Sequence, residues 1–85
     1  MAQTIKSVKS GGWSDPATWD LNRVPHDGDK IIIGNDTRVT CEADMKQVRG
    51  GTVTFEGMGA VLDTSRIKVS GLAFKGGNAA VARED

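Results

Sequence analysis

Short apolar runs, each stopped by glycine or polar residues, limit what this chain can build. Lys30–Ile33 is rich in β-branched residues but too short for a helix. Arg38–Cys41 and Thr52–Phe55 alternate polar and apolar side chains, which is the pattern of half-buried strands. Similar short runs follow at 60–62, 67–69 and 72–74. We therefore expect an all-β protein made of very short strands.

The spacing of these runs indicates a repeat. Val48-Arg49-Gly50 and Val69-Ser70-Gly71 share the pattern V-x-G and lie twenty-one positions apart. At the same offset Cys41 corresponds to Leu62, and Val53 corresponds to Phe74. A repeat of about twenty residues with two or three short strands suits one coil of a β-solenoid. We favour a solenoid of about two coils, with a small antiparallel β-sandwich as the alternative.

In the solenoid we expect Val, Ile, Leu and Phe to point into the stack, while Thr, Lys and Arg face outward. Cys41 alternates in step with Val39, so we expect it to be a small buried apolar residue and not a reactive thiol. The candidate core residues are Ile31, Ile33, Val39, Cys41, Val48, Val53, Phe55, Leu62, Ile67, Val69 and Phe74.

The segment Gly11–Asp29 holds both tryptophans, both prolines and the only histidine. Asp15 can act as the N-cap of a single helical turn by accepting from the Thr18 amide, and Pro16 suits the first helical position. Such a turn fixes the direction of one indole relative to the other. Because the end of a solenoid exposes apolar side chains and strand edges, we expect this segment to form an N-terminal cap.

The second half of that segment is an extended stretch followed by a turn. Val24 precedes a proline and must be extended, and 26–29 forms a tight turn in which Gly28 can take a positive φ. The candidate cap residues are Trp13, Asp15, Pro16, Trp19, Pro25, Gly28 and Asp29.

The 85 residues form one small domain. Residues 1–10 are expected to be an arm or an edge strand, and 11–77 the β-rich domain, with the cap at 11–29 and the strands at 30–77. The stretch 42–47 is ambiguous between a loop and a helical turn. The tail 78–85 lacks strand character, and we expect it to be loose or helical.

Charge and hydropathy exclude several partners. Eleven basic and eleven acidic residues cancel, so the basic footprint of a nucleic-acid binder is missing. No segment approaches the ~20 apolar residues of a membrane span, and the N-terminus lacks the apolar run of a secretory signal. We expect a protein made in the cytoplasm, with no nucleic-acid or membrane partner.

No catalytic, cofactor-binding or metal-binding set can be assembled. His26 with Asp27 and Asp29 could ligate a metal, but three polar residues in a turn are more often only a turn. A single histidine and the absence of a G-x-S-x-G elbow argue against nucleophilic catalysis. One cysteine provides neither a disulfide nor a zinc motif. We expect no enzyme and no cofactor.

The opening motif nevertheless resembles a known family. The run G-x-W-S-D-P-A-T-W (Gly11–Trp19), then V-P-x-x-G-D (Val24–Asp29), is similar to the start of the glycine-rich G-eight domain. That domain opens large right-handed parallel β-helix proteins of cell surfaces, and bacterial and phage β-helix proteins begin in the same way. The resemblance implies a right-handed β-helix module. Where such relatives act on glycans, we expect the parts that carry their catalytic residues to be missing from this chain.

Two functions remain open. The first is a non-enzymatic structural module that self-associates, with a trimer favoured, and attaches to a larger assembly such as a phage capsid, where it would be a decoration protein of the virion. A core this thin gains stability by burying more surface against a partner. The second is a carbohydrate-binding module of a β-helix surface protein, which would need solvent-exposed faces on Trp13 and Trp19.

Overall fold

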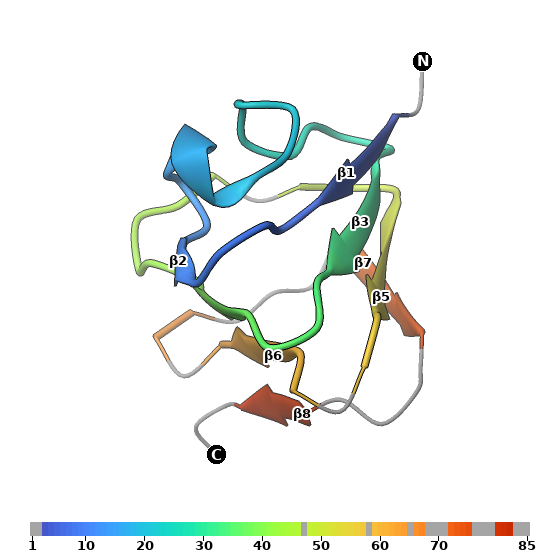
Figure 1. Ribbon diagram of the computed structural model, residues 1–85. Helices are drawn as coiled ribbons and strands as arrows, with labels where there is room; N and C mark the ends of the chain where they lie inside the picture. The colour runs from blue at the N-terminus through green and yellow to red at the C-terminus, as the bar shows by residue number, and fades with distance from the viewer. Residues whose placement is uncertain are drawn as a thin grey trace.

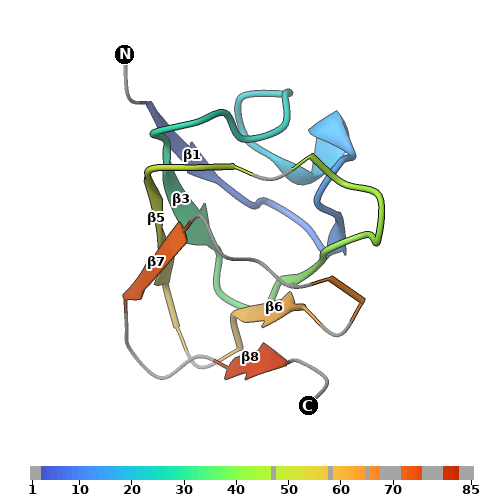
Figure 2. The same ribbon diagram turned by 180° about the vertical axis from the view of Figure 1, so that it is seen from behind.

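The computed structural model describes residues 3–46, 48–57, 59–64, 66–67, 72–75 and 80–82. They form a mostly β structure with a single 3-10 turn (Figures 1 and 2). The elements in chain order are β1 (Thr4–Lys6), β2 (Gly11–Gly12), η1 (Pro16–Thr18), β3 (Lys30–Ile33), β4 (Arg38–Thr40), β5 (Gly51–Phe55), β6 (Val61–Asp63), β7 (Leu72–Lys75) and β8 (Ala80–Ala82). No helix among these residues is long and apolar enough to cross a membrane.

The strands alternate between two parallel sheets. The odd-numbered strands follow the order β1-β3-β5-β7, and the even-numbered strands the order β2-β4-β6-β8. All six strand pairs in the described residues are parallel, so the alternative of an antiparallel sandwich is wrong. Two turns of the chain separate β1 from β5, which is consistent with a β-solenoid of about two coils, and β7 and β8 continue the two sheets.

Each coil has one short and one long connection. Four or five residues join an odd strand to the following even strand, at 7–10, 34–37 and 56–60. The return from an even strand to the next odd strand is longer, at 13–29, 41–50 and 64–71. Parallel neighbours need a crossover of this kind because a tight hairpin can only join antiparallel strands.

The register confirms part of the predicted repeat and corrects another part. Val53 pairs with Phe74, at the expected offset of twenty-one. Leu62, however, pairs with Val39 and not with Cys41. The reason is a change of offset: β3 and β5 are twenty-two positions apart, whereas β4 and β6 are twenty-three apart. The extra residue lies in the connection 56–60, and the predicted match of Val48 to Val69 lies outside the described residues.

The expectation of a loose or helical tail is wrong for Ala80–Ala82, which forms β8 against β6. Two alanines give this segment little intrinsic strand preference, and its backbone pairing with a neighbouring strand decides the conformation. The rest of the tail lies outside the described residues. Of the predicted strand at 67–69, Ile67 lies in a bend, and the other two residues are not described.

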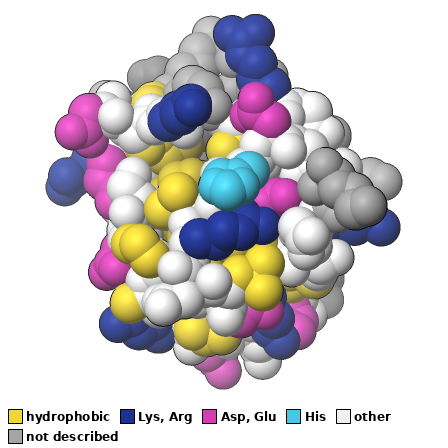
Figure 3. Space-filling view, turned by 90° about the horizontal axis from the view of Figure 1, so that it is seen from above, with side chains coloured by type: hydrophobic (Ala, Val, Ile, Leu, Met, Phe, Trp, Pro, Cys, Tyr) yellow, Lys and Arg dark blue, Asp and Glu magenta, His cyan; other side chains and the backbone are white. Residues whose placement is uncertain are grey.

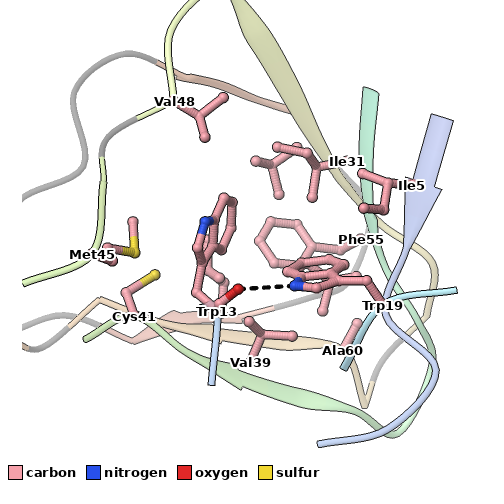
Figure 4. Packing of buried hydrophobic residues seen from close by; sticks show 13 residues of the cluster. Ile5, Trp13, Trp19, Ile31, Val39, Cys41, Met45, Val48, Phe55 and Ala60 are labelled. Atoms are coloured by element: carbon pink, nitrogen blue, oxygen red, sulfur yellow. Dashed lines mark hydrogen bonds between the residues drawn. The ribbon is translucent and has the colours of Figure 1, made fainter. Parts of the chain in front are cut away.

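A single apolar cluster fills the space between the sheets (Figure 4). It consists of Ile5, Trp13, Trp19, Ile31, Ile33, Val39, Cys41, Met45, Val48, Val53, Phe55, Ala60 and Leu62, with Ile67 partly buried against it. Eight of the candidate core residues are therefore in the cluster, and the side chains of Val69 and Phe74 lie outside the described part. Full burial of one such aliphatic side chain contributes roughly 1.5–3 kcal/mol.

Buried hydroxyls occupy the corner between β3 and β4. Thr37 Oγ1 lies 2.7 Å from Ser7 Oγ and donates to the Gly34 carbonyl, while the Gly34 amide donates to Ser7 Oγ. The expectation that threonines face outward therefore fails at Thr37. Its hydroxyl can be buried because it is hydrogen-bonded to the Gly34 carbonyl, which also accepts the Thr37 amide, and to the Ser7 hydroxyl.

Replacing Gly34 with alanine should destabilise the protein. A Cβ at this position would collide with the backbone carbonyl oxygen of Ser7. Because a backbone atom cannot rotate away, we expect a loss of about 1–3 kcal/mol in the free energy of unfolding. Thermal and urea unfolding of Gly34→Ala measure it. A melting temperature equal to that of the wild type would contradict the close approach of these two segments.

Candidate functional site

The N-terminal end of the stack is organised by η1. Asp15 is the N-cap and Pro16 opens the turn, as the sequence predicts. The predicted capping bond needs a correction: the Asp15 carboxylate accepts from the Ala17 amide at 3.0 Å, and the Thr18 amide donates to the Asp15 carbonyl. In this turn of three residues the carboxylate bonds the amide of the second residue, Ala17. The sequence alone does not distinguish this amide from that of the third residue, Thr18.

The two tryptophans pack against each other under this turn. Their ring centroids are 5.3 Å apart at an interplanar angle of 79°, an edge-to-face arrangement. Trp19 Nε1 donates to the Trp13 carbonyl at 2.9 Å (Figure 4). Each indole is only 2% exposed. Neither therefore offers the open face on which a sugar ring stacks.

Residues 18–20 cover the outer edge of β1. The Val8 amide donates to the Thr18 carbonyl at 2.8 Å, and the Asp20 amide donates to the Lys6 carbonyl at 2.8 Å. The Asp20 carboxylate also accepts from the Lys6 amide. The outward backbone groups of Lys6 and the amide of Val8 are thus satisfied by the chain itself, so this part of the edge is covered.

A buried carboxylate joins the cap to the first strand. Asp29 Oδ2 accepts from the His26 amide at 2.8 Å and from Arg23 Nη1 at 2.9 Å, and Oδ1 accepts from the Gln3 amide at 3.3 Å. Burial by itself raises the pKa of Asp29, but the hydrogen bonds from His26, Arg23 and Gln3 outweigh it and hold the pKa below its ordinary value.

The turn before this carboxylate has the predicted form. Gly28 has a φ of 81°, and the Asp29 amide donates to the His26 carbonyl. The Gly28 amide donates to the Arg49 carbonyl, so the turn also contacts the connection between β4 and β5. Pro25 is buried beside it. Gly28, Pro25 and Asp29 therefore belong to the same end of the molecule as the tryptophans.

The other end of the stack is built differently. Among the described strands β7 pairs only with β5, and β8 pairs only with β6 (Figure 2). Hydrogen bonds alternate along the ladders, with Thr52 and Glu56 bonded towards β3 and Val61 bonded towards β4. The same alternation points the backbone amides of Phe74 and Val81 away from their paired strands.

The described residues contain no group of three His, Cys, Asp or Glu side chains that could hold a metal ion. The contact between His26 and Asp29 is made by the backbone amide of His26 and not by its ring. Cys41 is fully buried, and burial, together with the negative charges of Glu42 and Asp63, raises the pKa of its thiol to about 12. Such a thiol stays protonated at neutral pH.

Several polar contacts had no signal in the sequence. Lys6 pairs with Glu56 across fifty positions, and Arg38 pairs with Asp63 across twenty-five. The sequence also gives no sign that Arg23 pairs with Asp29. Pairing between coils depends on register, and no local motif predicts which charged residues will meet.

Trp19→Ala should destabilise the protein by about 3–5 kcal/mol, because it leaves a large cavity in the core and an unpaired Trp13 carbonyl. Leu21→Ala, two positions later at a residue that is 42% exposed, is the control and should change stability by less than about 0.5 kcal/mol. Urea unfolding compares the two. Equal midpoints for the two variants would refute the structural role of this indole.

Asp29→Asn should cost about 1.5–3 kcal/mol through the loss of charge-assisted hydrogen bonds. Because the folded-state pKa is lowered, the carboxylate stabilises the fold above its ordinary pKa, and this contribution is lost as pH falls through the folded value. Melting temperatures between pH 6 and pH 2 should therefore fall less steeply in Asp29→Asn than in the wild type. Asp44→Asn, at an exposed position, should retain the wild-type slope. Parallel pH profiles for the wild type and Asp29→Asn would contradict this role.

Comparison of the chain with protein-family models, with known proteins and with solved structures finds no match. The features that bear on function are therefore those of the chain itself: a closed end stabilised by two indoles and a buried carboxylate, and strand edges at the opposite end.

Proposed function

We propose that this protein is a non-enzymatic structural module, a short right-handed β-helix with an N-terminal tryptophan cap. It self-associates, with a trimer as the expected state, and attaches to a larger protein assembly. A capsid decoration protein of a phage virion is the concrete form of this proposal.

The difference between the two ends of the stack carries the proposal. At one end the outer groups of Lys6 and Val8 are bonded to residues 18–20. At the other end the outward amides of Phe74 and Val81 face no described strand. Open strand edges pair readily with other chains. The self-association of this module would therefore involve β7 and β8.

Size, charge and the opening motif support the same function. The core cluster is small, and additional burial against a partner stabilises a small domain. A net charge of zero removes long-range repulsion between copies. The resemblance of Gly11–Asp29 to the opening of β-helix proteins adds phage relatives as a precedent.

Light scattering over a hundredfold dilution, combined with amide hydrogen exchange, tests the proposal. We expect a closed oligomer, and we expect exchange at Phe74 and Val81 to slow as concentration rises. The amides of Thr52 and Glu56, which are bonded within the stack, serve as internal controls and should exchange at rates independent of concentration. A monomer at every concentration, with unchanged exchange at all four amides, would refute self-association.

A further inference from the structure

The turn at residues 26–29 contains Asp27-Gly28, the only place in the chain where an aspartate or an asparagine is followed by glycine. Asp27 is exposed, and Figure 3, which looks onto this end of the stack, shows the single histidine, the residue before it, at the surface. An aspartate before glycine isomerises readily, because glycine has no side chain to hinder attack of its amide nitrogen on the neighbouring carboxyl carbon. The turn therefore contains a candidate site of spontaneous backbone modification.

The reaction needs no reagent other than water. The Gly28 nitrogen forms a bond to Asp27 Cγ, and the amide proton leaves with a carboxyl hydroxyl as water, which gives a five-membered succinimide ring. A second water then adds to one ring carbonyl, and the bond from that carbonyl carbon to nitrogen breaks. Breakage at Cγ restores aspartate. Breakage at the main-chain carbonyl gives isoaspartate, in which the backbone runs through Cγ and the α-carboxylate is free.

The geometry of the turn requires the glycine that makes this reaction easy. Gly28 has a φ of 81°, in the left-handed region that side chains disfavour. A Cβ placed on it would meet nothing within 4 Å, so the backbone conformation and not crowding demands glycine. Replacing the glycine would remove the reactive dipeptide only by straining the turn.

Both reacting groups are held by the backbone of one residue, Arg49. The Gly28 amide donates to the Arg49 carbonyl at 2.9 Å, and Asp27 Oδ1 accepts from the Arg49 amide at 3.1 Å. Ring closure removes the amide proton and brings the carboxyl carbon onto the nitrogen. Neither group can do this while it keeps its hydrogen bond to Arg49.

The segment that carries Arg49 is itself anchored. It belongs to the connection 41–50, in which Met45 and Val48 are buried in the core cluster. The hydrogen bonds to the turn therefore last as long as this connection stays packed against the core.

We propose that Asp27-Gly28 is an isoaspartate-forming site that the fold keeps unreactive through Arg49, and that it reacts when the connection 41–50 separates from the cap. No residue of β7 or β8 takes part in these hydrogen bonds, so the site is independent of self-association.

Isomerisation changes the contacts of the cap. It adds one methylene group to the backbone of the turn and removes the carboxylate that accepts the Arg49 amide. The same turn carries the buried Asp29 carboxylate, which accepts the His26 amide across it. A longer backbone at Asp27 displaces these two residues relative to each other, so the modification loosens the cap.

Incubation of the full chain at neutral pH, followed by trypsin digestion, tests the site. The peptide 24–30 is released by cleavage after Arg23 and Lys30, and its aspartyl and isoaspartyl forms have the same mass but separate by chromatography. Isoaspartate should form at least about tenfold more slowly in the native chain than in the chain kept unfolded in guanidinium chloride, because only opened molecules react. Equal rates in the two states would overturn the proposal.

Asp27→Glu is the chemical control, because its longer side chain would have to close a six-membered ring. The unfolded Asp27→Glu chain should form almost no isomerised peptide 24–30. If it forms as much as the unfolded wild type, the modification lies at Asp29, which the peptide also contains, and the assignment to Asp27 is wrong.

Two buried valines separate local opening from global unfolding. Val48→Ala loosens the connection that holds the turn, and should raise the native rate of isomerisation by about threefold to tenfold. Val53→Ala, in β5, is the matched control and should raise it less when the two variants are compared at equal free energies of unfolding. Equal native rates in the two variants under that comparison would refute control by the connection 41–50.

Discussion

Backbone pairing of residues 18–20 with β1 is the interaction on which the rest of the stack depends. A parallel ladder leaves the outer groups of its first strand open, and here Lys6 and Val8 are bonded to Asp20 and Thr18. Because Trp19 lies between those two bonds, its side chain turns inward and becomes part of the core. One short segment thus covers part of the edge and contributes an indole to the first layer of the core. Each later strand takes its register from the strand before it.

The coils can differ in length because the extra residues lie in the connections and not in the paired strands. The longer connection shortens from seventeen residues (13–29) to ten (41–50) and then eight (64–71), while the strands stay in two sheets. The first of these connections is long enough to contain the cap, and the second contacts the cap through the hydrogen bond from the Gly28 amide to the Arg49 carbonyl. The specialised features of the molecule are therefore built in its connections, where sequence can change without loss of strand pairing.

The sequence predicts those parts of the structure that depend on local chemistry. Alternation in Thr52–Phe55 indicates a strand, Asp15 and Pro16 indicate a capped turn, and Gly28 indicates positive φ. Prediction from the sequence fails where pairing between residues far apart in the chain determines the structure. An extra residue in a connection moves the partner of Leu62 from Cys41 to Val39, and no pattern marks the partners of Asp29. These features arise only when residues from separate coils are brought into register.

Two ion pairs among the described residues link separate coils of the stack. Lys6–Glu56 and Arg38–Asp63 each join different coils along the sides of the stack, so these charges neutralise one another locally. Exposed pairs of this kind contribute at most about 1 kcal/mol, but they remove the uniform field that would attract a polyanion. The two ends of the stack differ in how their strands are covered. One is covered by the cap, and at the other β7 and β8 each pair with one neighbour among the described strands.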